Sequence, residues 1–309
     1  MQQQPENIRT KNLIVVVGPT AVGKTDLCVN LATHYKTEII SADSRQFYRE
    51  MSIGTAKPTQ EEQQGIPHHF VDSHSITEEY NAGAFEQEAL QLLEQLYQKH
   101  DVAIVTGGSG LYVRALCEGM DEMPETEPTI REQLTHILQT EGLEALLQKL
   151  KEVDPVYYSQ VDKANQQRVI RALEVSLSSG QPYSSFRKSE RVERPFRIIK
   201  IGLTRDRQEL YNRIDQRMDL MLEQGLLEEA KALYPYRQHN ALQTVGYKEI
   251  FDYLEGKYDW DEAVRLLKRN SRRYAKRQLT WFTKHPDEYT WFHPQQLPDI
   301  IRFIDETIV

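Results

Sequence analysis

A candidate phosphate-binding loop stands near the start of the sequence. The pattern G-x-x-x-x-G-K-[S/T] is met by Gly18, Gly23, Lys24 and Thr25, after an apolar run and before a predicted helix. The glycines allow backbone N–H groups to turn toward phosphate oxygens, and the helix start adds partial positive charge. Lys24 supplies a point charge, and the Thr25 hydroxyl is placed to ligate Mg²⁺. The loop predicts a bound diphosphate or longer phosphate chain with magnesium, without identifying the molecule that carries it.

One acidic residue is a candidate for chemistry beside this loop. Asp43 follows a short apolar strand in "IISADSRQFY", whereas the strand at 102–106 ends in Thr-Gly-Gly and lacks the usual metal-binding Asp. Asp43 could hold a metal's water shell in a kinase or NTPase, or it could act as a general base on an acceptor; a plain helix cap is a third possibility. Open α/β sheets bind ligands at the carboxyl ends of their strands, so both chemical roles place Asp43 beside the loop.

A basic segment lies near the end of the sequence, at residues 265–284. It contains no carboxylate, and its cations are Arg265, Lys268, Arg269, Arg272, Arg273, Lys276, Arg277 and Lys284. At helical spacing, four of them form one stripe: Arg265, Arg269, Arg272 and Lys276. In a chain of formal net charge −8, such a stripe is either a solvated helix face or a contact surface for a polyanion.

The elements that must position these residues alternate between strand and helix. Apolar runs at 13–17, 38–42 and 102–106 read as buried parallel strands, and 24–35 and 85–99 read as helices. This order predicts an α/β fold, a P-loop NTPase-like parallel sheet with flanking helices and right-handed crossovers. A further strand is expected at 196–204. The rest is expected to be helical, including the basic segment, up to a polar tail.

A helical insertion is predicted to interrupt this core. The acidic, proline-bearing stretch "GMDEMPETEPT" begins at Gly119, and the chain then reads as helices only until about residue 180. We therefore expect residues 12–118 and 196–309 to form the P-loop core with C-terminal helices. Residues 119–195 are expected to form the insertion.

The composition indicates a globular protein. The chain has 309 residues, and no apolar run approaches the roughly 20 residues that span a bilayer. Its two cysteines, Cys28 and Cys117, form no disulfide or metal pattern, which fits a reducing compartment. We expect a cytoplasmic protein with no membrane partner.

Seven motifs together resemble the tRNA dimethylallyltransferases, also called tRNA isopentenyltransferases. They run in family order between about residues 13 and 282, and they are "GPTAVGKT" (18–25), "SADSRQFYREMSIGTAKP" (41–58), "PHHFVD" (67–72), "GGSGLYVRAL" (107–116), "QRVIRALEV" (167–175), "RIDQRMDLMLEQGLLEE" (213–229) and "QTVGYKE" (243–249). The combination is far more specific than the phosphate-binding loop alone.

The resemblance implies an alkyl transfer. The donor would be dimethylallyl diphosphate, and the acceptor would be N6 of the adenosine at tRNA position 37, next to the anticodon, with diphosphate released. The catalytic residues would be Asp43 as base, with Lys24 and Arg217 at the leaving group; Arg213, one turn earlier, is a weaker candidate. The diphosphate would lie on Gly18, Pro19, Thr20, Ala21, Val22, Gly23, Lys24 and Thr25, with Mg²⁺ on Thr25.

The resemblance also assigns residues to tRNA. They are Asp43, Ser44, Arg45, Gln46, Ser109, Arg131, Gln167, Arg168, Val169, Ile170, Arg171, Gln243, Gly246, Lys248, Arg272 and Lys276. The insertion would grip the anticodon stem-loop. The sequence departs from the family at Ser109, where Thr is common, and at Glu50 and Ser52, where Gly and Asp are common. It also lacks the His-Pro-Asn-Asp lead before Gln167.

Three other functions use the same features. A P-loop nucleoside or small-molecule kinase would share the loop, but it leaves the basic segment unexplained. A non-catalytic RNA-binding module would not need both the Lys24–Thr25 pair and Asp43. An adenylate prenyltransferase would share the core, whereas the insertion and the basic segment favour a folded RNA acceptor. We expect a monomer, since one chain with an insertion can enclose a stem-loop.

Overall fold

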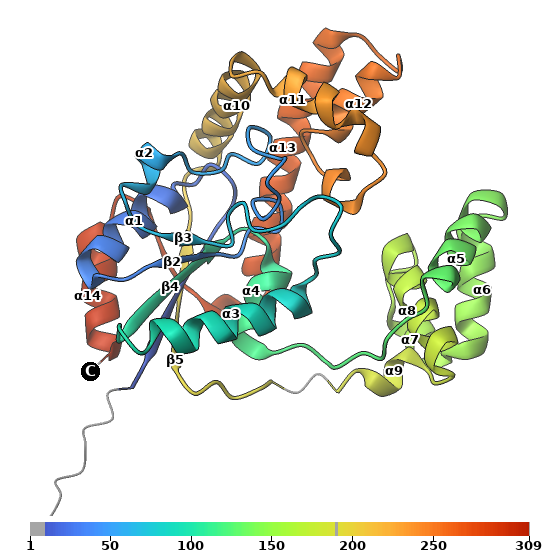
Figure 1. Ribbon diagram of the computed structural model, residues 1–309, viewed down its shortest axis with the longest axis horizontal. Coiled ribbons are helices and arrows are strands. Elements are labelled where there is room, and N and C mark those ends of the chain that lie inside the picture. The colour runs from blue at the N-terminus through green and yellow to red at the C-terminus, as the bar shows by residue number, and fades with distance from the viewer. Residues whose placement is uncertain (1–9, 189–190, 309) are drawn as a thin grey trace, which may run out of the picture. The chain divides into compact units, whose positions relative to one another are not determined.

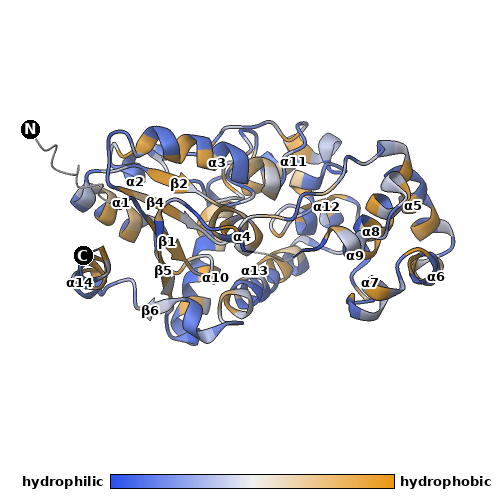
Figure 2. Cartoon of the chain, turned by 90° about the horizontal axis from the view of Figure 1, so that it is seen from below, coloured by the Kyte–Doolittle hydropathy of each residue, from blue (hydrophilic) through white to orange (hydrophobic). Residues whose placement is uncertain are grey.

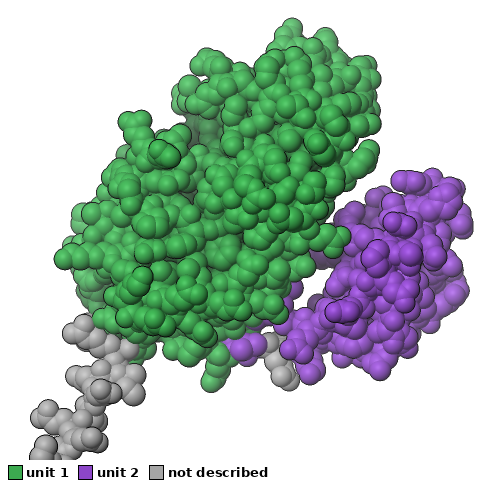
Figure 3. Space-filling view, in the orientation of Figure 1, with its two compact units in different colours: residues 1–118, 193–309 green, residues 119–192 purple. Residues whose placement is uncertain are grey.

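The computed structural model describes residues 10–188 and 191–308 (Figure 1). The chain divides into two compact units. Unit 1 comprises Met1–Glu118 with Glu193–Val309, and unit 2 comprises Gly119–Val192 (Figure 3). The insertion was predicted to extend to residue 195, whereas unit 2 ends at Val192.

A parallel sheet forms the centre of unit 1. In the described residues it has six strands in the order β3-β2-β4-β1-β5-β6, and every pairing is parallel. The strands are β1 (Asn12–Val17), β2 (Ile39–Ser41), β3 (His68–His69), β4 (Val102–Gly107), β5 (Arg197–Leu203) and β6 (Thr290–Phe292). Val17 at the end of β1 pairs with Gly107 and Gly202. The predicted α/β fold with a parallel sheet is confirmed.

Helices cover both faces of this sheet, which is why its central strands are continuous apolar runs. Alternate β1 residues pack to opposite sides. Leu13 and Val15 join a core with α3 (Ala82–Leu96) and α4 (Gly110–Glu118), whereas Ile14 and Val16 join one with α1 (Lys24–Tyr35) and α14 (Leu297–Ile308). Figure 2 shows helices such as α3 and α13 (Trp260–Phe282) carrying both hydrophobic and hydrophilic sides. The sheet is therefore buried, and its strand ends hold the loops.

A third core in unit 1 lies among the helices after β5. It packs α10 (Arg207–Glu223) and α11 (Leu226–Leu233) with α12 (Lys248–Leu254) and α13. Short helices at Tyr234–Tyr236 and Asn240–Leu242 link α11 to α12, and α2 (Gln60–Gln63) precedes β3. Tyr247 is fully buried there and donates to Glu229 Oε1 at 2.6 Å.

Unit 2 is a small helical body with its own core. Its helices are α5 (Pro128–Thr140), α6 (Leu143–Val153), α7 (Pro155–Gln160), α8 (Gln166–Ser179) and α9 (Tyr183–Phe186). Leu134, Leu146, Leu150 and Leu173 are among the buried residues. Proline at the first position of α5 and of α7 suits a helix start, since that N–H has no helical partner.

The structure corrects three boundaries. The predicted polar tail is wrong: β6 adds an edge strand, and α14 buries Ile300 and Ile304 against the sheet. Strand β3, only two residues long, carried no pattern to detect. Helix α3 begins before the predicted residue 85, because the Asn81 side chain caps it by accepting from the N–H groups of Gly83 and Ala84. Among the described residues, no helix is long and apolar enough to cross a membrane.

Candidate active site

The phosphate-binding loop, residues 18–25, joins the end of β1 to the start of α1. Gly23 is the N-cap of α1 and has φ of 108°, a left-handed conformation that favours glycine. In the described residues no side chain caps this helix. The N–H groups of its first turn are therefore available to an anion.

Lys24 folds back over this loop. Its Nζ donates to the carbonyl oxygens of Gly18 and Pro19, each at 2.9 Å. Burial lowers the pKa of Lys24 to about 8; Asp43 opposes this shift, and Arg217 adds to it. An anion bound at the loop would favour the charged ammonium and raise this pKa again.

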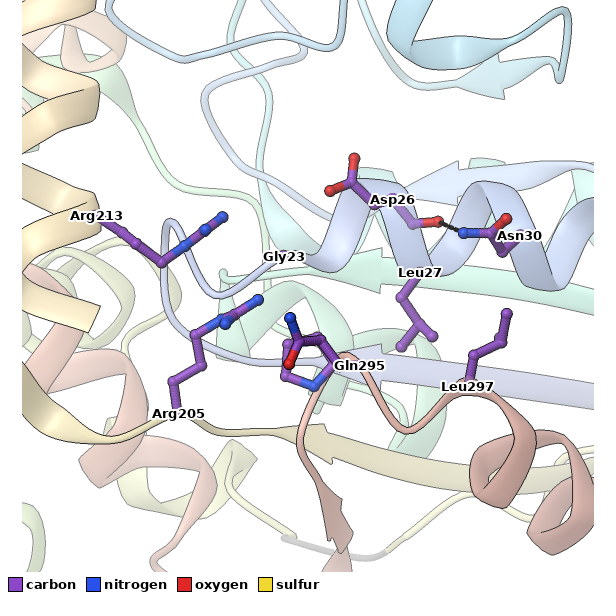
Figure 4. A pocket seen from close by; sticks show the side chains of 9 residues that line it. Gly23, Asp26, Leu27, Asn30, Arg205, Arg213, Gln295 and Leu297 are labelled. Atoms are coloured by element: carbon purple, nitrogen blue, oxygen red, sulfur yellow. Dashed lines mark hydrogen bonds between the residues drawn. The ribbon is translucent and has the colours of Figure 1, made fainter. Parts of the chain in front are cut away.

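Three arginines from the segment after β5 contact successive residues of the loop. Arg217 Nη1 donates to Thr20 Oγ1 at 3.4 Å, Arg213 Nε to the Ala21 carbonyl at 2.9 Å, and Arg205 Nε to the Val22 carbonyl at 2.7 Å. Arg205 and Arg213 also line a cavity of about 290 Å³ beside Gly23 (Figure 4). We call these three residues the loop arginines.

Only two of the loop arginines were predicted as site residues. Arg217 was assigned to the leaving group, Arg213 was the weaker candidate, and Arg205 was missed. Arg217 also donates Nη2 to the Ala56 carbonyl at 3.3 Å, and burial lowers its pKa against the opposing effect of Asp43. Arg205 additionally pairs with Glu209 and His293. Its only sequence signal was its place directly after an apolar strand.

Asp43 lies just beyond β2. Its Oδ1 accepts from the Arg45 N–H at 3.0 Å, which fixes the turn that follows the strand. The preceding Ala42 N–H donates to the Thr106 carbonyl at 2.7 Å and ties this turn to β4. Asp43 is half-buried and close enough to Lys24 and Arg217 to act on the pKa of both. The structure therefore places the carboxylate beside the cations of the loop.

The residues after Asp43 are mostly engaged within the protein. The Ser44 N–H donates to Ser109 Oγ at 2.9 Å, so the ends of β2 and β4 are linked. Arg45 Nη1 donates to the Asn240 carbonyl at 3.1 Å. Gln46 Nε2 donates to the Ala56 carbonyl at 3.1 Å. The Gln46 amide thus holds a loop of the protein.

Gln278 was missed by the sequence analysis. It lies on α13 with 6% of its surface exposed; its Oε1 accepts from the Thr20 N–H at 2.9 Å, and its Nε2 donates to the Gly108 carbonyl at 3.0 Å. A Cβ on Gly108 would lie 2.1 Å from Gln278 Nε2, so this approach requires glycine. The available signal was a glutamine between the apolar positions Ala275 and Phe282, on the buried face of the basic segment.

Aromatic side chains surround the Asp43 region. Burial raises the pKa of Tyr274 to about 12, and Asp43 adds to the shift. Burial likewise raises the pKa of Tyr112 to about 12, with a smaller contribution from Asp43. Both phenols therefore stay protonated at neutral pH. Trp281 packs so closely on Gly110 that an added Cβ would lie 2.1 Å from its Nε1.

The basic segment carries less free charge than its sequence suggests. Lys268 pairs with Asp219 at 2.6 Å, Arg272 Nη1 with Asp215 at 2.5 Å, and Arg265 with Glu262 at 2.5 Å. These partners lie outside residues 265–284, two on α10 and one just before residue 265, so the pattern of the segment alone did not indicate them. Lys276 is exposed, and within the described residues no carboxylate pairs with it.

The tRNA-assigned residues of unit 2 divide into exposed and buried sets. Gln167 and Arg168 are exposed at the start of α8. Val169 and Ile170 lie in the unit 2 core, so their side chains cannot reach RNA. The Arg171 side chain forms an ion pair with Glu174.

Arg131 of α5 reaches the same carboxylate as Arg171. Arg171 Nη1 and Arg131 Nη1 contact Glu174 Oε2 at 2.9 and 3.1 Å. Arg131 and Arg171 therefore share one carboxylate although they lie on different helices.

The assigned residues between α11 and α12 also divide. Gln243 is exposed, but its Nε2 donates to the Arg237 carbonyl at 2.5 Å. Gly246 is buried, and its N–H donates to Glu249 Oε2 at 2.9 Å. Lys248 is exposed at the start of α12. Of these, Lys248 presents its charge to solvent.

The donor set suits a cation held mainly by a substrate. Among the described residues, no group of three His, Cys, Asp or Glu could form a metal site. Thr25 stands in the first turn of α1. Hydroxyl and phosphate oxygens with water suit a hard divalent cation, and no carboxylate cage is needed.

Known proteins resemble the chain over nearly its full length. It is 57% identical over 295 residues to the tRNA dimethylallyltransferase of Cytophaga hutchinsonii, covering 96% of this chain and 97% of that protein. It is 50% identical over 298 residues to tRNA dimethylallyltransferase 1 of Bacteroides fragilis, covering 96% and 99%.

Solved structures give the same result. The tRNA isopentenylpyrophosphate transferase of Bacillus halodurans has a TM-score of 0.71 and 39% identity, covering 96% of this chain and 97% of that one. A eukaryotic dimethylallyltransferase captured acting on tRNA has a TM-score of 0.78 and 29% identity, covering 94% and 75%.

The family model described as "IPP transferase" matches residues 46–285, a segment longer than half of the chain. These findings confirm the resemblance seen in the motifs. The chain belongs to the IPP transferase family.

Proposed function

We propose that this protein transfers a dimethylallyl group from dimethylallyl diphosphate to N6 of adenosine 37 in tRNA. The allylic C–O bond breaks, a C–N bond forms, the N6 proton passes to a base, and diphosphate leaves whole. The observation that carries the proposal is the meeting of Lys24, Arg217 and Asp43 at the carboxyl ends of the strands. Family membership supports it.

The phosphate-binding loop would act on the leaving group. As the C–O bond breaks, negative charge grows on the diphosphate, so fixed donors stabilise the transition state more than the ground state. These donors would be the loop N–H groups, the Lys24 ammonium and the Arg217 guanidinium. The cation is proposed to be Mg²⁺ held by Thr25 and the diphosphate, where it would neutralise the charge of the leaving group.

Asp43 would complete the transfer. Attack by N6 makes its proton acidic, and the Asp43 carboxylate can accept it. Its link to the Arg45 N–H holds the carboxylate beside the loop. Because an adenine in a stacked loop is poorly accessible, the base must turn out of the stack to reach Asp43.

The RNA would be held by exposed cations and by the loops at the strand ends. Arg168, Lys248 and Lys276 are exposed, and they suit contacts with phosphates, which position the RNA without reading its sequence. Ser44 and Ser109 lie beside Asp43, where the base would enter. We further propose that the protein is a monomer that works in the cytoplasm.

A labelling experiment separates this function from its rivals. The chain is incubated with tRNA that lacks the modification, with labelled dimethylallyl diphosphate in one arm and labelled ATP in the other, and digested RNA is analysed by mass spectrometry. We expect N6-dimethylallyladenosine in the first arm only.

Two controls identify the acceptor and the chemistry. Free AMP replaces tRNA in a third arm, and its prenylation with no RNA product would indicate the adenylate prenyltransferase. Conversion of ATP to ADP with no prenyl transfer would indicate the kinase. The Asp43→Asn variant should bind tRNA but form product about 10²–10⁴-fold more slowly.

A further inference from the structure

Unit 2 contains a buried carboxylate that has no place in the proposed chemistry. Glu174 of α8 is 3% exposed. Its Oε2 accepts from Arg171 Nη1 at 2.9 Å and from Arg131 Nη1 at 3.1 Å, while Oε1 accepts from Thr126 Oγ1 at 3.3 Å. We call these four residues the Glu174 cluster. Its members come from α5, α8 and the segment before α5, so it joins parts of the chain that are distant in sequence.

The two arginines of the cluster remain open to solvent although Glu174 is buried. The Arg131 side chain is 51% exposed and that of Arg171 is 42% exposed, against 5% for the Glu174 side chain. Each guanidinium has five N–H donors in a fixed fork, and bonding Glu174 through Nη1 leaves others for a second anion. The cluster therefore presents two oriented cationic groups at the surface of unit 2.

The charges of the cluster suit anion binding as well as stability. Two adjacent guanidinium groups repel one another, and the shared carboxylate offsets this repulsion. One negative and two positive charges leave a net charge of +1 at the surface, which can contact the phosphate backbone. Since arginine recognises phosphate through paired donors, fixing the two forks lowers the entropy that binding must overcome.

We propose that Glu174 is a positioning residue that orients Arg131 and Arg171 to grip the RNA backbone. This inference rests on the proposed function, because it presumes that unit 2 binds tRNA. It makes a prediction opposite to simple electrostatics. If Glu174 only neutralised the arginines, its removal would strengthen the binding of a polyanion. If it positions them, its removal weakens binding although the net positive charge rises.

The test compares Glu174→Gln with Glu132→Gln. Glu132 is exposed on α5 next to Arg131, so both variants change the charge of unit 2 equally. The dissociation constant for tRNA is measured between roughly 50 and 200 mM salt. We expect Glu174→Gln to weaken binding about tenfold and to make the salt dependence shallower by one to two phosphate contacts. Glu132→Gln should bind as the unchanged protein does, or slightly tighter.

Two further measurements separate positioning from loss of structure. The loss should fall on the KM for tRNA, while the KM for dimethylallyl diphosphate stays the same. Introducing Glu174→Gln into the Arg131→Gln/Arg171→Gln double variant should weaken tRNA binding no further, because the groups it orients are gone. If Glu174→Gln acted only by lowering the melting temperature, it would weaken tRNA binding by the parent and by the double variant alike. A loss of binding confined to the parent therefore indicates positioning.

The inference is overturned if Glu174→Gln binds tRNA unchanged or tighter, or if it weakens the double variant as much as the parent. The proposed function fails independently, if the unchanged protein does not prenylate tRNA. A protein that prenylates tRNA but is insensitive to Glu174→Gln would refute the inference alone.

Discussion

Two loop arginines of unit 1, Arg213 and Arg217, are held differently from the two arginines of the Glu174 cluster in unit 2. In unit 1 the loop arginines donate to backbone and hydroxyl oxygens of the phosphate-binding loop, and among the described residues neither Arg213 nor Arg217 has a carboxylate within ion-pair distance. In unit 2, Arg131 and Arg171 donate to the buried Glu174. Lys24 follows the unit 1 pattern, since its ammonium binds two carbonyl oxygens.

This difference corresponds to two kinds of anion binding. A cation that bonds only neutral oxygens can exchange them for a diphosphate and gain a full charge interaction, at the cost of burying its charge beforehand, as the lowered pKa of Lys24 and of Arg217 indicates. A cation already paired with a carboxylate gains less from a phosphate but keeps a fixed orientation. The first arrangement suits stabilisation of a leaving group, and the second suits reversible positioning of RNA.

The largest effect should come from the base. Asp43→Asn keeps the size of the side chain and removes the proton acceptor, so kcat should fall by about 10²–10⁴-fold. Single-turnover rates and tRNA affinity are measured on the same preparations. An equal loss of rate and of affinity would show that Asp43 binds RNA and does not act as the base.

A loop arginine should come next. Arg217→Gln removes charge at the leaving group, and kcat should fall by about 10²–10³-fold. Arg207→Gln is the matched control, because Arg207 lies exposed on the same helix. If the two variants lose activity equally, Arg217 does not stabilise the leaving group in the way proposed for unit 1.

Gln278→Ala should have a smaller effect, divided between stability and substrate binding. It leaves the Thr20 N–H and the Gly108 carbonyl unpaired, so the free energy of unfolding should fall by about 1–3 kcal/mol. The KM for dimethylallyl diphosphate should rise, because the loop loses a tether. Urea unfolding and steady-state kinetics measure the two effects, and an unchanged KM would limit Gln278 to a role in stability.

The smallest effect is a pH dependence of diphosphate binding. The folded-state pKa of Lys24 is lowered to about 8, so the unliganded ammonium loses its proton as the pH rises through that value. Ligand binding requires the proton, and affinity for magnesium diphosphate should fall up to about tenfold between about pH 8 and pH 9. Calorimetry in buffers of different ionisation enthalpy would detect the proton uptake.

Lys24→Arg is the control for this pH effect, since arginine stays charged throughout the range. The variant should bind magnesium diphosphate with little change in affinity above about pH 8. A variant that retains the full pH dependence would assign the titration to another group.

Sequence patterns predicted the parts of the fold that are local. The apolar run of β1, the loop glycines and the first two residues of α1 lie within 14 consecutive residues, 12–25, and their order alone indicates a phosphate-binding loop. Arg205 and Gln278 were missed because their partners lie 183 and 258 residues away in the chain. Only the packing of β5, α10 and α13 against the loop brings them there.

The same reasoning explains the other differences. Asp215 and Asp219 neutralise cations of the basic segment from α10, a pairing that no pattern within residues 265–284 could indicate. Ile300 and Ile304 lie one turn apart in α14, but a single apolar stripe in a polar tail was too short to recognise. Glu174 follows Arg171 by three residues, so that half of its cluster could have been predicted; Arg131 could not.

The central claim is that the bond between carbon and oxygen breaks and the diphosphate departs as one intact group, stabilised by the phosphate-binding loop. Dimethylallyl diphosphate carrying ¹⁴C in the prenyl chain and ³²P in both phosphates, given to the enzyme with unmodified tRNA, tests this claim directly. The account predicts that ¹⁴C enters the RNA as N6-dimethylallyladenosine and that all released ³²P is inorganic diphosphate. The molar amount of diphosphate released should equal that of the prenyl group transferred. Appearance of ³²P in the RNA, or its release as monophosphate, would contradict the account.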